Sequence, residues 1–386
     1  MEDRVGLSLG VWPSQARDSE RAAQRGRFLD RLRGVVGTRR RNGSGDRTVV
    51  PPARPVRRDS GGLAGLILVV ALLVVGAPAP AGAAGTGYLF VSSEKDNLVT
   101  VLDGRSLDKV QDIPTGDRPR GMRFSPDHKR LYVACGDSDR IDVIDVATLK
   151  VSGHLEVGED PERFDLSPDG RLLYVSNEDD ALLTVFDLRD GSRVREIEVG
   201  EEPEGVLASP DGRTVYVTSE VANMVHVIDT GDWAVRANVV VGNRPRRLVL
   251  TPDGRRLWVT NELSGNVSII DTADDRVVHT LGFEPKGFRP EDITPVGLVL
   301  DRAGKTAYVT LGGANHVAVV DVPDLRVRRY ILVGWRPWGI ALSRDGRTLY
   351  VTNGRSDDLS VIDVGTLKVR RSVPVGRVPY TVAVDD

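Results

Sequence analysis

The sequence repeats a unit of about 42 residues seven times, and this period constrains the fold more than any other feature. Each copy contains a strand-forming motif with an aromatic residue, such as "VYVTS" at 215–219. The aromatic residues of successive copies are 42, 42, 42, 42, 50 and 42 residues apart. Such a period is typical of propellers and repeat arrays, in which each unit buries its apolar faces against its neighbours. The aromatic residues are Phe90, Tyr132, Tyr174, Tyr216, Trp258, Tyr308 and Tyr350.

Two further residues recur with the same spacings, an aspartate after an apolar pair and a proline before a short apolar run. Because three independent registers agree, a chance repeat is excluded. The aspartates are Asp103, Asp145, Asp187, Asp229, Asp271, Asp321 and Asp363, and the prolines are Pro119, Pro161, Pro203, Pro245, Pro295, Pro337 and Pro379.

The copy around Tyr216 indicates four strands in each unit, at 205–209, 214–219, 224–230 and 234–242. These segments are rich in Val, Ile, Tyr and Thr and are separated by turn signals, as in all-β folds. In "SPDG" at 209–212, proline presets the backbone of a tight turn and glycine accepts its left-handed position. The repeated residues are therefore interpreted as structural.

The two ends of the repeat region are complementary. The first copy begins at Tyr88 without its innermost strand, whereas the last continues past Gly376 into an additional strand, "YTVAV" at 380–384. Pairing these ends would complete one unit and remove the exposed sheet edges. The sequence therefore predicts an all-β, seven-bladed β-propeller of four-stranded blades over 84–386, closed by pairing of the C-terminal strand with the N-terminal blade.

The residues before the propeller have a different composition. Residues 1–60 contain 14 Arg, no Lys and 7 acidic residues, and we expect a disordered leader or a translation start assigned too early. Residues 61–83 resemble a secretory signal peptide, because the apolar core from Leu63 to Val75 is shorter than the about 20 residues that span a bilayer. We expect a periplasmic or secreted protein without a membrane span after cleavage; the alternative is an uncleaved anchor.

Charge and residue usage exclude several classes of function. The net charge of −3 and the +7 of residues 1–60 leave −10 for the rest of the chain, which disfavours nucleic acid as a partner. The five His and the single Cys show no metal-ligand spacing, and no nucleophile elbow is present. The sequence therefore predicts no metal, no catalytic residues and no cofactor bound by a recognisable motif.

Function is expected where the copies differ, at the mouth of the central channel. The residue after each repeated proline should line this mouth, and charged and aromatic residues there predict a pocket for a partner or a small anionic ligand. The alternative is a solvated rim of charged loops. The predicted binding residues are Arg120, Glu162, Glu204, Arg246, Trp338 and Tyr380, with Val296 as the seventh position.

Neighbouring loops should add to the same face. Glu94, Glu178, Glu220 and Glu262 follow the second strands at equivalent positions, where a group of carboxylates could also attract Ca²⁺. Eight extra residues of the fifth copy lie within 282–295, in a loop that could form a lid, contact a partner or have no role. The predicted accessory residues are Arg118, Arg244, Trp335, Arg336, Phe283 and Phe288.

Several words of the sequence carry a family resemblance. The "YVTN" of Tyr350–Asn353, joined to "SPDG" hairpins, resembles the YVTN-repeat β-propellers. The words "GTGYLFVSSEKDNLVTVLDG", "RPRGMRFSPD" and "LYVACGDSDRIDVIDVATLKV", together with the enlarged fifth copy, resemble the β-propeller family associated with pyrroloquinoline quinone (PQQ)-dependent catabolism. This resemblance implies an exported accessory of periplasmic alcohol oxidation, with PQQ as an associated cofactor and no family catalytic residues.

Together these observations predict a non-enzymatic binding or scaffold propeller. Its mouth would hold a periplasmic protein, such as a component of a quinoprotein dehydrogenase system, or the quinone or a small anionic ligand. Two alternatives stay open, an enzyme of the lactonase or lyase type and a cell-envelope interaction module.

Overall fold

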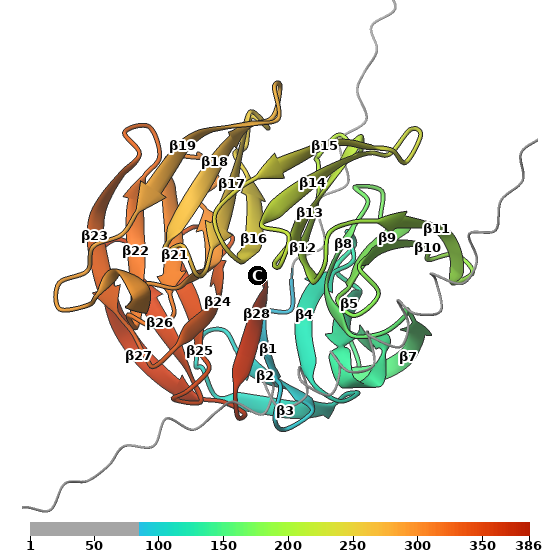
Figure 1. The fold of residues 1–386 in the computed structure, drawn as a ribbon. Coiled ribbons are helices and arrows are strands. Elements are labelled where there is room, and N and C mark those ends of the chain that lie inside the picture. The colour runs from blue at the N-terminus through green and yellow to red at the C-terminus, as the bar shows by residue number, and fades with distance from the viewer. Residues whose placement is uncertain (1–84) are drawn as a thin grey trace, which may run out of the picture. The chain divides into compact units, whose positions relative to one another are not determined.

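The computed structural model describes residues 85–386, which form 28 β-strands and two short 3-10 helices, η1 (Gly136–Ser138) and η2 (Pro290–Asp292). The predicted leader at 1–60 and signal peptide at 61–83 lie outside the described residues. The strands form seven antiparallel four-stranded sheets set around a common axis (Figure 1). The predicted seven-bladed propeller is confirmed.

Each blade runs outward from the channel through four consecutive positions. The innermost strands are β28 (Pro379–Asp385), β4 (Pro119–Phe124), β8 (Pro161–Leu166), β12 (Pro203–Ala208), β16 (Pro245–Leu250), β20 (Pro295–Leu300) and β24 (Pro337–Leu342). The second strands are β1 (Tyr88–Ser93), β5 (Arg130–Cys135), β9 (Leu172–Asn177), β13 (Thr214–Ser219), β17 (Arg256–Asn261), β21 (Thr306–Leu311) and β25 (Thr348–Asn353). The third strands are β2 (Leu98–Asp103), β6 (Arg140–Asp145), β10 (Leu182–Asp187), β14 (Met224–Asp229), β18 (Asn266–Asp271), β22 (His316–Asp321) and β26 (Asp358–Asp363). The outermost strands are β3 (Lys109–Pro114), β7 (Lys150–Glu156), β11 (Ser192–Glu198), β15 (Val235–Val240), β19 (Arg276–Gly282), β23 (Arg326–Leu332) and β27 (Lys368–Pro374).

The ring closes as predicted, through the first blade. Strand β28 pairs antiparallel with β1, so that Phe90 lies opposite Ala383. The carboxylate of Asp385 accepts hydrogen bonds from the backbone N–H and the hydroxyl of Thr86, at 2.8 and 2.7 Å. Because these residues come from opposite ends of the propeller, the two termini are joined by both a sheet ladder and side-chain bonds.

The repeated turn residues act as structural groups. In the fourth blade (β12–β15), the Ser209 hydroxyl donates to Asp211 and accepts from the Thr214 N–H, while Gly212 takes a left-handed backbone with φ of 70°. Asp229 accepts the N–H of Gly231 at 2.7 Å and thereby caps the turn after the third strand. These local hydrogen bonds explain why closely related turn motifs recur along the chain.

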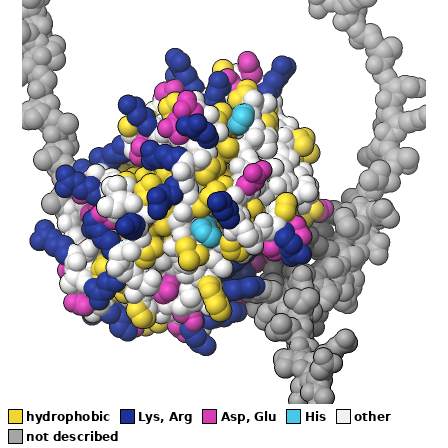
Figure 2. All heavy atoms as spheres, turned by 90° about the vertical axis from the view of Figure 1, so that its left-hand side faces the viewer, with side chains coloured by type: hydrophobic (Ala, Val, Ile, Leu, Met, Phe, Trp, Pro, Cys, Tyr) yellow, Lys and Arg dark blue, Asp and Glu magenta, His cyan; other side chains and the backbone are white. Residues whose placement is uncertain are grey.

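The apolar core lies between neighbouring blades. All six residues of β13 are buried, and Tyr216 packs with Val225 of its own blade and Leu257 of the next. The outermost strands are exposed and polar, as Arg326, Arg328 and Arg329 of β23 illustrate. Figure 2 shows such basic side chains scattered among hydrophobic and acidic ones on one side of the propeller. Within residues 85–386 no helix is long and apolar enough to cross a membrane.

Candidate functional site

The residues predicted to surround the channel mouth occupy the second position of each innermost strand. Their positions are fixed by hydrogen bonds between blades, because a hydroxyl of one second strand donates to the backbone carbonyl of the mouth residue in the next blade. The pairs are Ser92 with Arg120, Ser176 with Glu204, Thr218 with Arg246, Thr260 with Val296, Thr310 with Trp338 and Thr352 with Tyr380, at 2.7–3.1 Å.

The seventh blade-to-blade position has no such bond. Ala134 stands where the other second strands have Ser or Thr, so that the backbone carbonyl of Glu162 receives no equivalent hydroxyl. The third residue of several innermost strands is glycine, since a Cβ at Gly121 would lie 3.1 Å from the carbonyl oxygen of Glu162. Neighbouring innermost strands therefore approach closely enough to bring their charged side chains into contact.

Arg246 is the centre of the first charged cluster. This buried guanidinium forms ion pairs with Glu204 (Nη1–Oε2, 2.7 Å), with Glu262 (Nε–Oε2, 2.7 Å) and with Glu220. Burial opposes ionisation of Glu262, but the guanidiniums of Arg246 and Arg336 outweigh this effect and lower the pKa of Glu262 to about 2. One carboxylate from strand β12 and two from the loops after β13 and β17 thus share the Arg246 cation.

The second cluster surrounds Glu162, whose side chain is fully buried. Glu162 pairs with Arg120 and with Arg118, whose Nη2 lies 3.2 Å from the Glu162 Oε1. The Nε of Arg120 lies 3.0 Å from a carboxylate oxygen of Glu94, and Arg118 also pairs with Asp160. The mouth is therefore an alternation of guanidiniums and carboxylates rather than a surface of one charge.

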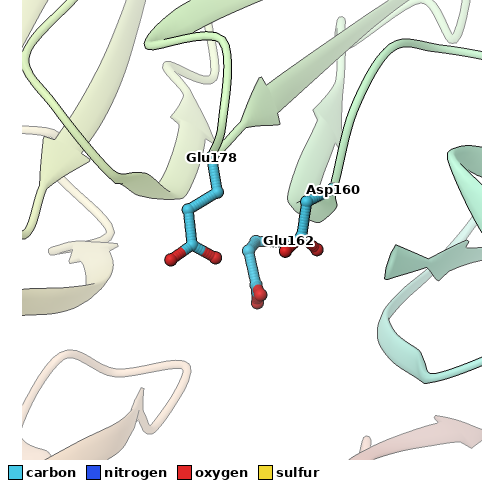
Figure 3. A group of neighbouring side chains, drawn as sticks. All are labelled: Asp160, Glu162 and Glu178. Atoms are coloured by element: carbon cyan, nitrogen blue, oxygen red, sulfur yellow. The ribbon is translucent and has the colours of Figure 1, made fainter. Parts of the chain in front are cut away.

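Glu178 differs from the other acidic residues of the mouth. Oxygens of Asp160, Glu162 and Glu178 lie within 4.8 Å of one another, and Figure 3 shows the three carboxylates gathered from neighbouring elements. Within residues 85–386, the half-buried Glu178 side chain forms no hydrogen bond or ion pair. Burial and the neighbouring Asp160 carboxylate raise the pKa of Glu178 to about 7.

The three carboxylates of Asp160, Glu162 and Glu178 are close enough together to bind a cation. However, neighbouring arginine guanidiniums already balance their negative charge. Glu162 and Asp160 both pair with Arg118, and Glu162 also pairs with Arg120. A metal ion would have to displace these pairs, which are charge-assisted and largely withdrawn from water. Glu178 can instead act as a proton acceptor, because its carboxyl group changes charge near neutral pH.

Two aromatic residues form the other side of the mouth. The rings of Trp338 and Tyr380 lie with their centroids 5.5 Å apart. The guanidinium of Arg120 lies 4.4 Å from the Tyr380 ring centroid, and that of Arg246 lies 5.4 Å from the Trp338 centroid. The Tyr380 hydroxyl donates to Glu204 at 3.1 Å, so that the aromatic side is joined to both charged clusters.

All six predicted binding residues therefore meet at one site, although their binding role stays a prediction. Asp160 was not predicted, and Glu94, Glu178, Glu220 and Glu262 lie outside the predicted binding and accessory residues. These four glutamates were recognised only as equivalent loop acids. Arg163 and Arg247 directly follow Glu162 and Arg246 in the sequence and were not among the predicted binding residues either. The sequence shows the positions of these residues in the repeat, but it does not show how deeply they are buried or which residues they pair with.

The accessory residues divide into those at the mouth and those away from it. Arg244 pairs with Glu220, and Arg336 donates to Glu262 at 2.5 Å, so both lie in the charged network. Arg118 lies there as well. Trp335 is exposed over 66% of its surface and stands outside that network.

The predicted accessory role of Phe283 at the mouth is wrong because its side chain is buried in the core, whereas that of the partly exposed Phe288 stays a prediction. Phe283 is 5% exposed and packs in a hydrophobic cluster with Leu281 and Ile293, because the inserted loop buries its own apolar side chains. Phe288 packs edge-on against His316 of the next blade, at 5.6 Å between ring centroids. The loop reaches the mouth through a polar residue instead, since the Thr294 hydroxyl accepts a hydrogen bond from Arg336 at 2.8 Å.

Comparison with protein families gives two partial matches. Residues 233–384 match the family described as "Lactonase, 7-bladed beta-propeller", and residues 84–205 match the cytochrome D1 heme domain. Each match covers less than half of the chain. A comparison with curated proteins finds no match.

Solved structures share the fold over most of the chain. Kuenenia stuttgartiensis hydrazine synthase has a TM-score of 0.66 at 26% sequence identity, over 72% of this chain and 92% of that one. The periplasmic gluconolactonase PpgL of Pseudomonas aeruginosa has a TM-score of 0.66 at 24% identity, over 78% and 99%. The dihydro-heme d1 dehydrogenase NirN, in complex with DHE, has a TM-score of 0.60 at 19% identity, over 77% and 75%.

These matches overturn the prediction of a non-enzymatic propeller. The C-terminal part of the chain, which contributes Arg246, Trp338 and Tyr380 to the mouth, is similar to a family of lactonases. The enzymatic alternative is the one that the comparisons favour, and the binding or scaffold prediction is wrong. The chain is a seven-bladed β-propeller with similarity to the lactonase family in its C-terminal part and to the cytochrome D1 heme domain in its N-terminal part.

Proposed function

We propose that this protein hydrolyses a lactone at the channel mouth, with Glu178 as the general base. The observation that carries the proposal is the state of Glu178, a half-buried carboxylate without a hydrogen bond or ion pair within residues 85–386 and with a pKa raised to about 7. A base with a pKa near the working pH combines a large ionised fraction with a strong driving force for proton transfer.

The other requirement of ester hydrolysis is a donor for the developing oxyanion. The guanidiniums of Arg118 and Arg120 both pair with the buried Glu162, with 20% and 12% of their own side chains exposed. Such preorganised, partly desolvated cations stabilise negative charge more strongly than water does. The similarity of the C-terminal part to lactonases and the fold shared with a periplasmic gluconolactonase support a cyclic ester as the substrate.

The reaction balances with water as the second reactant. Glu178 accepts a proton from water as the water oxygen bonds to the lactone carbonyl carbon, and the carbonyl electron pair moves to oxygen beside Arg120. Collapse of this intermediate breaks the bond between the carbonyl carbon and the ring oxygen. The proton on Glu178 then passes to the departing alkoxide, which gives a hydroxy acid and restores the base.

The test is hydrolysis of D-glucono-δ-lactone by the purified protein at pH 6.5, monitored through the release of acid. The uncatalysed reaction is measured in parallel. Glu178→Gln should lower kcat about 100-fold or more, because it removes the proton acceptor and keeps the shape. Glu201→Gln, an exposed carboxylate outside the site, is the matched control and should keep wild-type turnover. Wild-type protein that does not exceed the uncatalysed rate with any aldonolactone would refute the proposal.

Two finer expectations remain proposals of their own. Export to the periplasm rests on the signal-like segment at 61–83, and a fold shared with a gluconolactonase described as periplasmic supports it. A connection to PQQ-dependent catabolism, with the quinone or a dehydrogenase component as a partner, rests on family resemblance alone.

A further inference from the structure

Arg163 follows Glu162 on the innermost strand β8 and has no role in the mechanism above. Its side chain crosses over Gly121 of the neighbouring strand β4, where a Cβ would lie 2.9 Å from the Arg163 Cδ. The glycine therefore leaves the space through which Arg163 reaches the centre of the mouth. The guanidinium lies 5.7 Å from the Tyr380 ring centroid.

The guanidinium of Arg163 has no counter-charge in direct contact. Within residues 85–386 its side chain forms no ion pair and no hydrogen bond, and its Nε is buried without an acceptor. By contrast, the two other arginines near Tyr380 are paired, Arg120 with Glu94 and Arg247 with Glu204. Burial and the positive charge of Arg247 lower the pKa of Arg163 to about 9. A cation held in this way gains from binding an anion.

A second unused donor lies on the other aromatic residue. In the part of the chain that the structure describes, the indole Nε1 of Trp338 is buried without a hydrogen-bond partner, and its ring lies beside that of Tyr380. The Tyr380 hydroxyl itself is saturated, since it accepts from Arg247 at 2.6 Å and donates to Glu204 at 3.1 Å. Within residues 85–386, the aromatic side of the mouth therefore offers one unpaired positive charge, one unpaired N–H and the partly exposed Trp338 side chain, whereas the Tyr380 ring is buried beneath guanidiniums.

From this arrangement we infer that Arg163 binds the carboxylate of a hydroxylated acid whose carbon chain packs against Trp338. A guanidinium recognises a carboxylate through parallel N–H donors, and aromatic faces contact the C–H groups of a sugar chain. A single unpaired cation balances a monocarboxylate, whereas a phosphate dianion would leave a negative charge among the nearby glutamates. The choice of a sugar acid rests on the proposed function, whose product is a hydroxy acid of this class.

Binding is measured without turnover, by calorimetric titration of the purified protein with sodium D-gluconate at pH 8, where inorganic phosphate is mainly a dianion. Inorganic phosphate and the neutral polyol sorbitol are titrated in the same buffer. Gluconate should bind, and Arg163→Met should weaken its binding about 10- to 100-fold. The exposed Arg213 lies in a turn at the opposite end of its blade, so Arg213→Met is the matched control and should bind gluconate like wild type. Gluconate should also change the tryptophan fluorescence, and Trp338→Phe should abolish that change.

The outcomes separate this inference from the proposed function. Equal gluconate affinity in wild type and Arg163→Met, or tighter binding of phosphate than of gluconate, overturns the inference even if lactones are hydrolysed. Gluconate binding that depends on Arg163, in a protein that hydrolyses no lactone, supports the inference and refutes the proposed function. Should Arg163→Met fail to fold, Arg163→Lys keeps the charge without the planar fork, and we expect a smaller loss of gluconate affinity.

Discussion

Replacement of Glu178 by glutamine should stabilise the protein at alkaline pH while it impairs hydrolysis. In the folded protein the pKa of Glu178 is raised to about 7, whereas its ordinary value, which applies to the unfolded chain, is 4.5. The folded state therefore binds the proton more tightly than the unfolded state does. Consequently, the stability contributed by Glu178 is complete below pH 4.5 and is lost as the pH rises to about 7.

The magnitude follows from the interval between these two pKa values. At about 1.4 kcal/mol per pH unit, the interval corresponds to about 3 kcal/mol, and the partial exposure of the Glu178 side chain reduces the expected loss to about 2 kcal/mol. Glutamine has nearly the same shape and does not ionise. The Glu178→Gln variant should thus exceed the free energy of unfolding of wild type by only about 0.5 kcal/mol at pH 5 and by about 2 kcal/mol at pH 8.5.

Urea unfolding at both pH values, at one fixed ionic strength, measures this difference without adding a salt that would screen the mouth charges. Glu201→Gln provides the control, because it makes the same change at an exposed carboxylate. A difference between Glu178→Gln and wild type that is the same at pH 5 and pH 8.5 would show that Glu178 ionises normally. The argument for Glu178 as a general base would then fail as well.

Three further predictions concern the structure that holds the site. Arg246→Met should destabilise the protein by about 3–5 kcal/mol in urea at pH 7, because three buried carboxylates lose their shared cation; a loss below 1 kcal/mol would contradict the buried network. Thr352→Val should cost about 2 kcal/mol, since its hydroxyl joins two buried backbone groups of neighbouring blades, and an unchanged urea midpoint would exclude this role. Ala181→Asn should stabilise the protein by about 1 kcal/mol, because residue 181 has a left-handed backbone where other blades have Asn, Asp or Gly. Asn223→Ala makes the reverse change in the next blade and should lower the melting temperature; equal melting temperatures for both variants would count against the explanation.

The repeat determined the architecture because it acts through short-range chemistry that the sequence displays directly. Three sequence features predict the blade number, the strand order and the closure of the ring. They are the repeated turn motif, the apolar second and third strands, and the complementary ends of the repeat region. All of these were confirmed in residues 85–386. The mouth positions were also readable, because a residue with a fixed place in the repeat has a fixed place in the ring.

Tertiary structure alone decided what those residues do there. The side chains of Arg336 and Glu262 meet across 74 positions of sequence, and those of Arg247 and Tyr380 across 133. Long side chains from several blades reach the same small volume, so the choice of partner depends on the distances and burial of all of them together. For this reason the sequence places Glu178 and Arg163 at the mouth, but only the packed ring leaves the first without a hydrogen bond and the second without a counter-charge.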